Sequence, residues 1–195
     1  MSEIAVLDVG YGNTDSIRLA FERLGAAVTL TADSAVVEQT ARLVLPGVGS
    51  AKYAMARLAE LGLVEALRRR AGPTLGICLG MQLLFDHSEE GDTPCLGLVA
   101  GRVRAMTPSP GHPVPHMGWT RLEWADDATG LAAGDYLYFA HSFACDDGPA
   151  TAARATYGGH PVSAALRAGH LWGAQFHPER SSAPGARFLQ AFLSA

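Results

Sequence analysis

The first half of the chain alternates short continuous apolar runs with stretches of helical periodicity. Residues 3–8 form a β-rich run that ends in a glycine-containing turn, and residues 14–24 then place apolar side chains at helical spacing before Gly25. A strand followed by an amphipathic helix and a closing glycine is a β-α unit. The same pattern predicts strands at residues 27–31, 41–45 and 73–78, one or two helices within 51–70 broken near Gly62, and a helix that opens within 79–86.

These apolar runs are continuous rather than alternating, which is typical of strands that are buried on both faces. Repeated β-α units of this kind predict an α/β fold of three layers, in which a mostly parallel open sheet lies between two layers of helices. In such a sheet, ligands bind at the carboxyl ends of the strands. We therefore expect the functional residues where strands end.

The second half has a different pattern, in which strand-like runs are separated by turns. The expected strands are residues 99–106, 120–124, 136–145, 152–157, 162–166 and 170–176, and residues 186–193 are expected to form a closing helix. The extra strands predict an antiparallel extension of the sheet. Residues 108–115 are a Pro-rich loop, and no composition break is long enough for a linker, so residues 1–195 are predicted to form a single domain.

The composition narrows the possible functions. Apolar residues make up 48% of the 195 residues and charged residues 17%, which indicates a folded protein and argues against disorder. A net charge of −4 gives no basic footprint for nucleic acid or for an anionic membrane surface. The apolar run at residues 4–7 is too short for a signal peptide or a membrane span. We therefore expect a cytoplasmic protein whose partner is a small molecule or another protein.

Neither a metal site nor a cofactor motif is expected. Cys78, Cys95 and Cys145 form no C-x-x-C pair, and the histidines lack the spacing of metal ligands. The sequence also has no glycine-rich motif for phosphate or dinucleotide binding between a strand and a helix. At least one thiol must remain free.

The sequence Gly-Ile-Cys-Leu-Gly at residues 76–80 follows an apolar strand and precedes a predicted helix. This is the pattern of a nucleophile elbow, in which a tight turn lifts the side chain above the sheet and flanking glycines let neighbouring backbone pass. A cysteine at a helix N-terminus also meets free N–H groups and the positive end of the helix dipole, which favour the thiolate. Cys78 is thus a candidate nucleophile, although the pattern alone also fits a buried structural cysteine.

A candidate base follows the last predicted strand, in Gln-Phe-His-Pro-Glu at residues 175–179. In extended backbone, His177 and Glu179 project to the same side, and Pro178 is expected to keep the segment from curling into a helix. His177 could then deprotonate Cys78 while Glu179 fixes the imidazole tautomer. The alternative for these residues alone is a solvated surface turn. Their occurrence together with the cysteine elbow, each at a strand end, favours catalysis.

A third candidate segment is Pro-Gly-Val-Gly at residues 46–49, directly after the strand expected at residues 41–45. A flexible loop at a strand end could point a backbone N–H at the acyl oxygen of a substrate. Together with the N–H of Leu79, it would form an oxyanion hole. The alternative is a plain strand-to-helix turn.

Leu-Pro-Gly at residues 45–47, the Cys78 segment with Gln82, and His-Pro-Glu at residues 177–179 together resemble the three signature segments of class I glutamine amidotransferases. The resemblance runs from end to end of the chain and implies the flavodoxin-like fold of that family. It implies a triad of Cys78 with the histidine and glutamate of the third segment. It also implies that Gln82 and the backbone near Gly47 hold the substrate L-glutamine, without a cofactor.

Three segments resemble, more narrowly, the glutaminase subunits of imidazole glycerol phosphate synthase. They are residues 46–49, His-Met-Gly-Trp at residues 116–119, and Tyr-Phe-Ala-His-Ser-Phe at residues 138–143. This resemblance implies oxyanion N–H groups from Val48 and Leu79, the former only after its loop rearranges. The residues implied around the glutamine are Gly47, Gly49, Gln82, Ser142 and Phe143.

The same resemblance implies a heterodimer with a cyclase subunit that is a (β/α)8 barrel. Asn13, Trp119 and Arg180 would lie at the contact with this partner. The barrel would conduct ammonia to the substrate that is aminated. The products would be imidazole glycerol phosphate and an aminoimidazole carboxamide ribonucleotide, in histidine biosynthesis.

The chain departs from the family pattern at Val9, Thr120 and Phe143, which lie outside the implied triad. One alternative is another class I enzyme, the glutaminase subunit of pyridoxal phosphate synthase, whose Pro-Gly-Gly-rich segment is absent here. A second is a free-standing cysteine hydrolase on a similar sheet, which need not carry Glu two residues after His. A third is a non-catalytic module that kept the sheet, and the intact Cys-His-Glu set argues against it.

Overall fold

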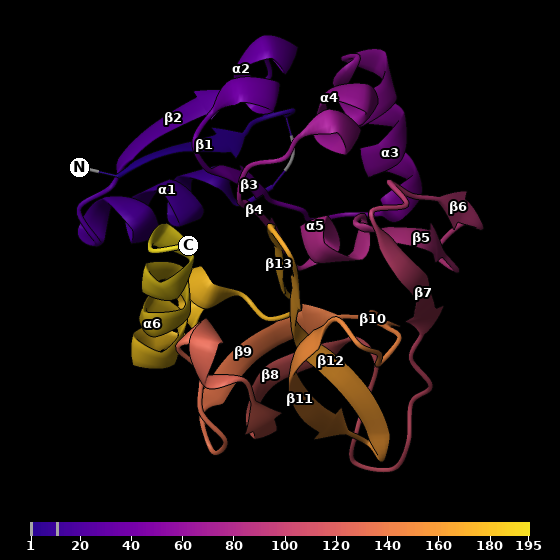
Figure 1. The fold of residues 1–195 in the computed structure, drawn as a ribbon. Coiled ribbons are helices and arrows are strands. Elements are labelled where there is room, and N and C mark those ends of the chain that lie inside the picture. The colour runs from indigo at the N-terminus through magenta and orange to yellow at the C-terminus, as the bar shows by residue number, and fades with distance from the viewer. Residues whose placement is uncertain (1, 11) are drawn as a thin grey trace.

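The computed structural model describes residues 2–10 and 12–195, so Tyr11 of the predicted first turn lies outside the described residues. Its first half is a series of β-α units (Figure 1). The predicted break near Gly62 is confirmed, because this residue adopts a φ of 68° between two helices. In chain order the elements are β1 (Glu3–Leu7), α1 (Thr14–Arg23), β2 (Ala27–Thr31), α2 (Ser34–Gln39), β3 (Leu43–Leu45), α3 (Ala51–Glu60), α4 (Leu63–Arg69), β4 (Thr74–Ile77) and α5 (Leu79–Gln82).

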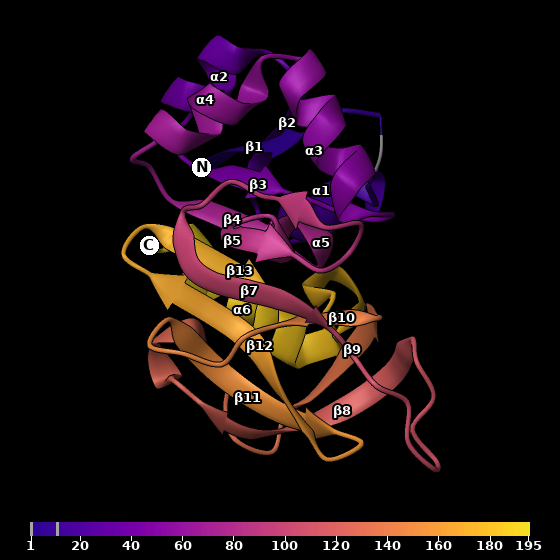
Figure 2. The same cartoon turned by 90° about the vertical axis from the view of Figure 1, so that its right-hand side faces the viewer.

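The main sheet of the described structure has nine strands in the order β2-β1-β3-β4-β13-β12-β11-β8-β9. Its strands from the second half are β8 (His116–Ala125), β9 (Tyr136–His141), β11 (Thr151–Tyr157), β12 (His160–Ala168) and β13 (Leu171–Ala174). Strand β13 is the junction, because it pairs in parallel with β4 and antiparallel with β12. The strands β2, β1, β3, β4 and β13 are parallel to one another, and β12, β11, β8 and β9 continue the sheet by antiparallel pairing. This confirms the predicted antiparallel extension, which forms the lower half of Figure 2.

A second sheet runs in the order β10-β7-β5-β6 and was not indicated by the sequence patterns. Its strands are β5 (Phe85–Ser88), β6 (Thr93–Pro94), β7 (Val99–Ala105) and β10 (Phe143–Cys145). The helix expected within residues 79–86 is therefore short, since it ends at Gln82 and the chain turns into β5, which pairs with β7. The single strand expected at residues 136–145 is also wrong, because it divides at Ser142 between the two sheets.

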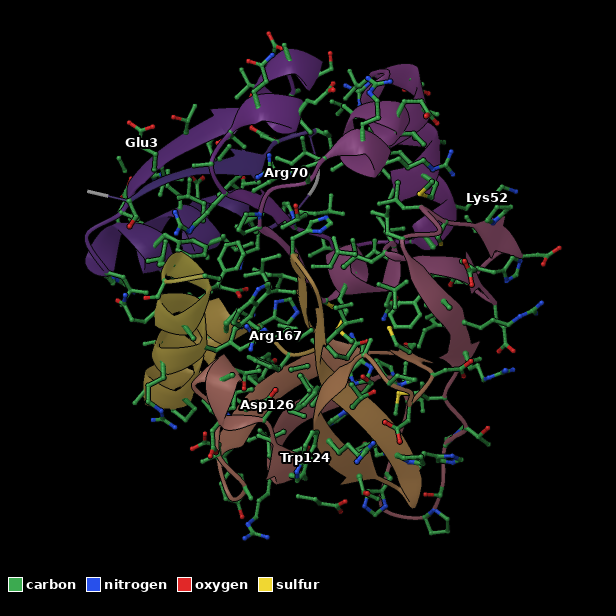
Figure 3. The ribbon with its side chains drawn as sticks, viewed as in Figure 1. Glu3, Lys52, Arg70, Trp124, Asp126 and Arg167 are labelled. Atoms are coloured by element: carbon green, nitrogen blue, oxygen red, sulfur yellow. The ribbon has the colours of Figure 1, made fainter. Side chains whose placement is uncertain are left out.

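Both faces of the inner parallel strands β1, β3, β4 and β13 are covered, whereas the edge strand β2 is largely exposed. Along β1, Ile4 and Val6 belong to one hydrophobic cluster, whereas Ala5 and Leu7 belong to the other. This alternation is required of a strand that is buried on both sides. The first cluster includes residues of α1 and α6 (Ser182–Leu193), and the second includes residues of α3 and α4. The predicted three-layer α/β class is confirmed, and Figure 3 shows the side chains that fill the space between the layers.

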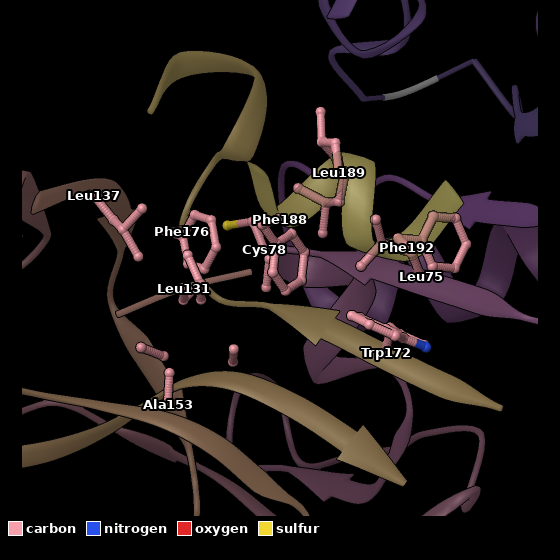
Figure 4. Packing of buried hydrophobic residues seen from close by; sticks show 14 of the residues in the cluster. Leu75, Cys78, Leu131, Leu137, Ala153, Trp172, Phe176, Phe188, Leu189 and Phe192 are labelled. Carbon is pink, nitrogen blue, oxygen red and sulfur yellow. The ribbon is translucent and has the colours of Figure 1, made fainter. Parts of the chain in front are cut away.

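The aromatic part of the first cluster fixes the end of β13 (Figure 4). Trp172 packs edge to face against Phe188 at 5.9 Å, and Phe176 packs against the same ring at 5.3 Å between centroids. Because Phe188 belongs to α6, these contacts hold that helix against the last strand of the parallel sheet. The segment that carries His177 therefore begins directly after a ring, Phe176, that is packed against α6. No helix within the described residues is long and apolar enough to span a membrane.

Candidate active site

Cys78 lies in the turn between β4 and α5, as the glycine pattern predicts. Its backbone has a φ of 53° and a ψ of −111°, an unusual conformation for a residue other than glycine. Such strain persists only where the surroundings hold it, and it is frequent at functional sites. The side chain is 7% exposed, at the carboxyl end of a central strand of the parallel sheet.

Three glycines allow the backbone around this turn to pack closely. A Cβ at Gly80 would collide with the carbonyl oxygen of Leu45. At Gly76 it would lie 2.5 Å from the carbonyl oxygen of Gly80, and at Gly47 it would lie 2.5 Å from the Gly80 nitrogen. The 46–49 segment is thus in direct contact with the turn that follows Cys78. This proximity was expected for the two segments suggested to form an oxyanion hole.

His177 and Glu179 interact, although not in the backbone conformation expected for them. Residues 178–180 form a short 3-10 helix, so the prediction that Pro178 prevents helical backbone is wrong. Proline fits the first position of a helical turn, where its fixed φ is suitable and no N–H is needed. The His177 Nδ1 nevertheless lies 2.9 Å from Glu179 Oε1, and the glutamate side chain is fully buried.

The charge state of His177 follows from its neighbours. Burial disfavours the imidazolium, but hydrogen bonds and negative charges from Cys78 and Glu179 outweigh burial and raise the pKa of His177 to about 10. The imidazole is therefore held between the thiol and the carboxylate, with the glutamate on Nδ1. This arrangement suits a thiolate paired with an imidazolium, in which the histidine can return a proton to a leaving group.

Two groups that contact the cysteine sulfur were not indicated by the sequence patterns. The Gln175 amide nitrogen lies 3.9 Å from Cys78 Sγ, and the Ala140 carbonyl oxygen lies 3.7 Å from it. Gln175 is fully buried. The signal that could have indicated it is the presence of a polar residue within an otherwise apolar run that is predicted to be a strand. The Gln82 amide donates to Gln175 Oε1 at 3.0 Å and to the Phe143 carbonyl at 2.9 Å, which makes Gln82 part of the same network.

A cavity of about 520 Å³ opens beside Cys78. This volume is within the usual range of small-molecule sites. The residues suggested by sequence that line it are Asn13, Val48, Gly49, Cys78, Leu79, Gln82, Ser142, Phe143, His177 and Arg180. Three suggested residues do not line it: Gly47 packs beneath the turn, Glu179 lies behind His177, and Trp119 lies on β8.

The rim of the cavity carries exposed apolar side chains. Met117 of β8 lines the cavity and is 65% exposed, and Trp119 on the same strand is 50% exposed. Trp119 packs against the Tyr138 ring at 6.0 Å, and the Arg180 guanidinium lies over the same ring at 4.9 Å. Within the described residues, no group of three His, Cys, Asp or Glu side chains is arranged to hold a metal ion.

Comparisons with known proteins give the family of this chain. A sequence model of the family described as glutamine amidotransferase class-I matches residues 5–195. The imidazole glycerol phosphate synthase subunit HisH of Xylella fastidiosa is 51% identical, covering 99% of this chain and 98% of the relative. The protein of the same name from Xanthomonas axonopodis is 48% identical with the same coverage.

Solved structures show the same fold. The crystal structure of a glutamine amidotransferase has a TM-score of 0.78 at 23% identity, covering 98% of this chain and 97% of that one. The structure of PurLQS from Thermotoga maritima has a TM-score of 0.66 at 20% identity, also covering 98% of this chain and 97% of that one.

Proposed function

This chain belongs to the class-I glutamine amidotransferase family, and on that premise we propose that it is the glutaminase subunit of an imidazole glycerol phosphate synthase in histidine biosynthesis. It hydrolyses L-glutamine to glutamate and ammonia. The observation that carries the proposal is the buried His177, held between Glu179 at 2.9 Å and the strained Cys78 beside a cavity. The two HisH relatives, similar over their whole length, support the assignment to this synthase.

The proposed reaction begins with the Cys78 thiolate. Its sulfur attacks the side-chain amide carbon of glutamine and forms a tetrahedral oxyanion. The His177 imidazolium then gives its Nε2 proton to the amide nitrogen, the C–N bond breaks, and ammonia leaves a thioester on Cys78. His177 next removes a proton from water, which attacks the thioester and releases glutamate. Glu179 accepts from Nδ1 throughout, so it keeps the other ring nitrogen directed at the reacting atoms.

The oxyanion is assigned to the backbone N–H groups of Leu79 and Val48. Contact between the 46–49 segment and the turn after Cys78 supports this pairing. Val48 is 41% exposed and the next residue, Gly49, has a φ of 91°, and we infer that this loop rearranges before the Val48 N–H donates. Loss of one oxyanion donor typically lowers turnover about 100- to 1,000-fold. A subunit whose Val48 N–H points away from the oxyanion would therefore hydrolyse glutamine only very slowly.

The substrate is placed in the cavity between Gly49, Gln82, Ser142 and Phe143, with Gly47 beneath it. All of these except Gly47 line the cavity. The Gln82 amide nitrogen is already used by Phe143 and Gln175, so Gln82 acts through its carbonyl oxygen or by holding Phe143 in place.

The proposed partner is a cyclase subunit with a (β/α)8 barrel, docked over the cavity mouth. Exposed Met117 and Trp119 together with Arg180 supply an apolar and cationic rim for such a contact. Asn13 lies at the same opening. Ammonia released into water would be protonated, so a partner that covers the mouth and receives ammonia through its barrel fits the chemistry.

The direct test measures glutamate release by the purified chain, first alone and then with the cyclase subunit of the same organism and its ribonucleotide ligand. Activity that is low alone and rises many-fold with the ligand-bound partner supports the proposal. Equal activity without the partner would contradict the assignment to this synthase, and the chain would have to be assigned to another pathway. The Cys78→Ala complex should lose glutaminase activity yet still form product from ammonium salt, and normal glutamine turnover in that variant would contradict the assigned nucleophile.

A further inference from the structure

Asn13 occupies the N-cap position of α1 but does not cap the helix. Asparagine is a favoured N-cap because its side-chain oxygen can accept from a free N–H of the first turn. Here the side chain makes no such hydrogen bond. The Asn13 Nδ2 instead lies 3.3 Å from Glu179 Oε1, a residue 166 positions later in the chain.

The environment of Glu179 makes this second donor important. Its side chain is fully buried, and Oε1 accepts from both His177 Nδ1 and Asn13 Nδ2. Among the described residues, Oε2 has no hydrogen-bond partner. A buried carboxylate that lacks hydrogen bonds is costly, so each donor to it matters. Within the described part of the chain, the Asn13 amide is thus the only neutral group seen to donate to this carboxylate.

The backbone around the contact holds it in place. Asn13 follows Gly12, whose φ is 109° and whose added Cβ would lie 3.3 Å from the Pro46 Cβ. The chain entering α1 is therefore packed against the 46–49 segment. Asn13 also lines the cavity, so its amide lies between the open site and the buried carboxylate.

We propose that Asn13 is a positioning residue of the glutaminase site, which acts by orienting Glu179 and thereby stabilising the imidazolium of His177. The inference rests on the proposed function and adds a role for a residue otherwise assigned only to the partner contact. Without the amide, Glu179 keeps a single donor, and it can rotate or withdraw from Nδ1. His177 is then a weaker base, and the fraction of Cys78 present as thiolate falls.

The test measures alkylation of Cys78 by iodoacetamide as a function of pH, in the full chain without partner or glutamine. Peptide mass spectrometry identifies the modified cysteine. Burial raises the pKa of Cys95 to about 11 and the pKa of Cys145 well above its ordinary value, so both thiols react more slowly. Wild-type Cys78 should react readily near pH 6.5. The Asn13→Ala variant should react about tenfold more slowly there, as loss of one charge-assisted hydrogen bond predicts.

Two further variants separate positioning from helix capping. Asn13→Ser places another residue favoured at the N-cap at this position but is too short to reach Glu179, so its alkylation profile should match that of Asn13→Ala. If Cys78 in Asn13→Ser were alkylated at the wild-type rate at each pH, the inference would be wrong. Asp15→Asn is the matched control, because Asp15 lies in the same helical turn with a side chain that is 79% exposed. It should leave the profile unchanged.

The outcome also distinguishes the inference from the proposed function. If wild-type Cys78 is alkylated at pH 6.5 no faster than a cysteine in an unstructured peptide, the thiolate–imidazolium pair is wrong and the catalytic assignment fails with it. If wild-type Cys78 reacts faster than that peptide and both Asn13 variants react at the wild-type rate, only the role of Asn13 fails. In the complex with the cyclase subunit, the Asn13→Ser variant should show a lower kcat with KM unchanged, because its effect acts through His177 rather than on glutamine.

Discussion

His116 Nδ1 lies 3.0 Å from His141 Nε2, in the middle of a buried chain of hydrogen bonds. His141 Nδ1 lies 2.8 Å from the Phe143 carbonyl, which can only accept, so this nitrogen carries a hydrogen. In a neutral ring His141 Nε2 then accepts from His116, and His116 Nε2 accepts from the Thr120 hydroxyl at 2.8 Å. Thr120 therefore supplies a donor, although it departs from the family pattern. The chain links β8 to the carbonyl that also receives Gln82.

This histidine pair predicts a loss of stability in mild acid. Burial lowers the pKa of His116 to about 4, with a further contribution from His112, and burial also lowers the pKa of His141 to about 4. Both values lie below the ordinary value of 6.5 that applies to the unfolded chain, so their contribution is complete above pH 6.5 and declines as the pH falls towards 4. Each imidazole changes the free energy of unfolding by at most about 1.4 kcal/mol per pH unit.

Urea unfolding at pH 7 and pH 5 measures this effect. The double variant His116→Gln/His141→Gln should be less stable than wild type at pH 7 but lose less stability on going to pH 5. His160→Gln, which removes an exposed imidazole, should retain the wild-type dependence. An unchanged slope in the double variant would show that other groups cause the acid sensitivity.

The His177 imidazole should be a cation over the neutral pH range. Its pKa is raised to about 10 by Cys78 and Glu179 against the opposing effect of burial. NMR titration of the ring should therefore show no deprotonation between pH 6 and 8 in wild type. Cys78→Ala removes one of the two stabilising groups and should lower the pKa of His177. A wild-type midpoint near 6.5 would contradict the charged pair.

The same shift predicts the alkaline behaviour of the fold. Because the pKa of His177 in the folded state lies above its unfolded value, its contribution to stability is complete below pH 6.5 and is lost as the pH rises towards 10. The free energy of unfolding should fall over that range in wild type. The free energy of unfolding of His177→Gln should fall less over the same range, as measured by the same urea titrations.

Local patterns were sufficient for the elbow and for most of the β-α units, although they did not indicate α2 at Ser34–Gln39. The glycines around Cys78 indicate where backbone segments meet, and the structure places their α-carbons where no Cβ fits. The strand assignments of the first half also follow from continuous apolar runs. These features depend on the residues themselves and their immediate neighbours in the chain, so the sequence alone predicts them.

Features that depend on distant partners could not be predicted in this way. The apolar run after Gln82 is compatible with a helix, and it leaves the helix only because Phe85 to Ser88 pair with β7. No local signal connects Asn13 with Glu179, since 166 positions separate them. The division at Ser142 likewise reflects pairing of the two halves of one apolar run with different sheets.

Arg70 should be far more important for stability than its neighbour Arg69. The Arg70 side chain is buried, and its guanidinium donates to Thr74 Oγ1 and to the carbonyls of Val37, Glu38 and Pro73 at 2.9 to 3.4 Å. It thereby ties the end of α2 to the start of β4. Arg70→Met leaves these oxygens without their donor and should lower the free energy of unfolding by about 3 kcal/mol.

The matched control for that prediction is Arg69→Met. The Arg69 side chain is 60% exposed and forms an ion pair with Glu38 at 3.2 Å. Exposed ion pairs contribute about 0 to 1 kcal/mol, so this variant should remain close to wild type in urea unfolding. Similar losses in both variants would mean that the buried contacts of Arg70 contribute no more than a surface charge does.

Gly80→Ala should damage both the fold and the glutaminase activity. The added Cβ would overlap the Leu45 carbonyl oxygen, and because this is backbone, the 46–49 segment must move away from the turn at Cys78. Forced overpacking typically costs about 1 to 3 kcal/mol, and we expect the upper end here. Gly148→Ala is the control, because its Cβ would meet no atom within 4 Å. If thermal unfolding and glutamate release in the complex were equal for both variants, close packing at Gly80 would not be what positions the nucleophile.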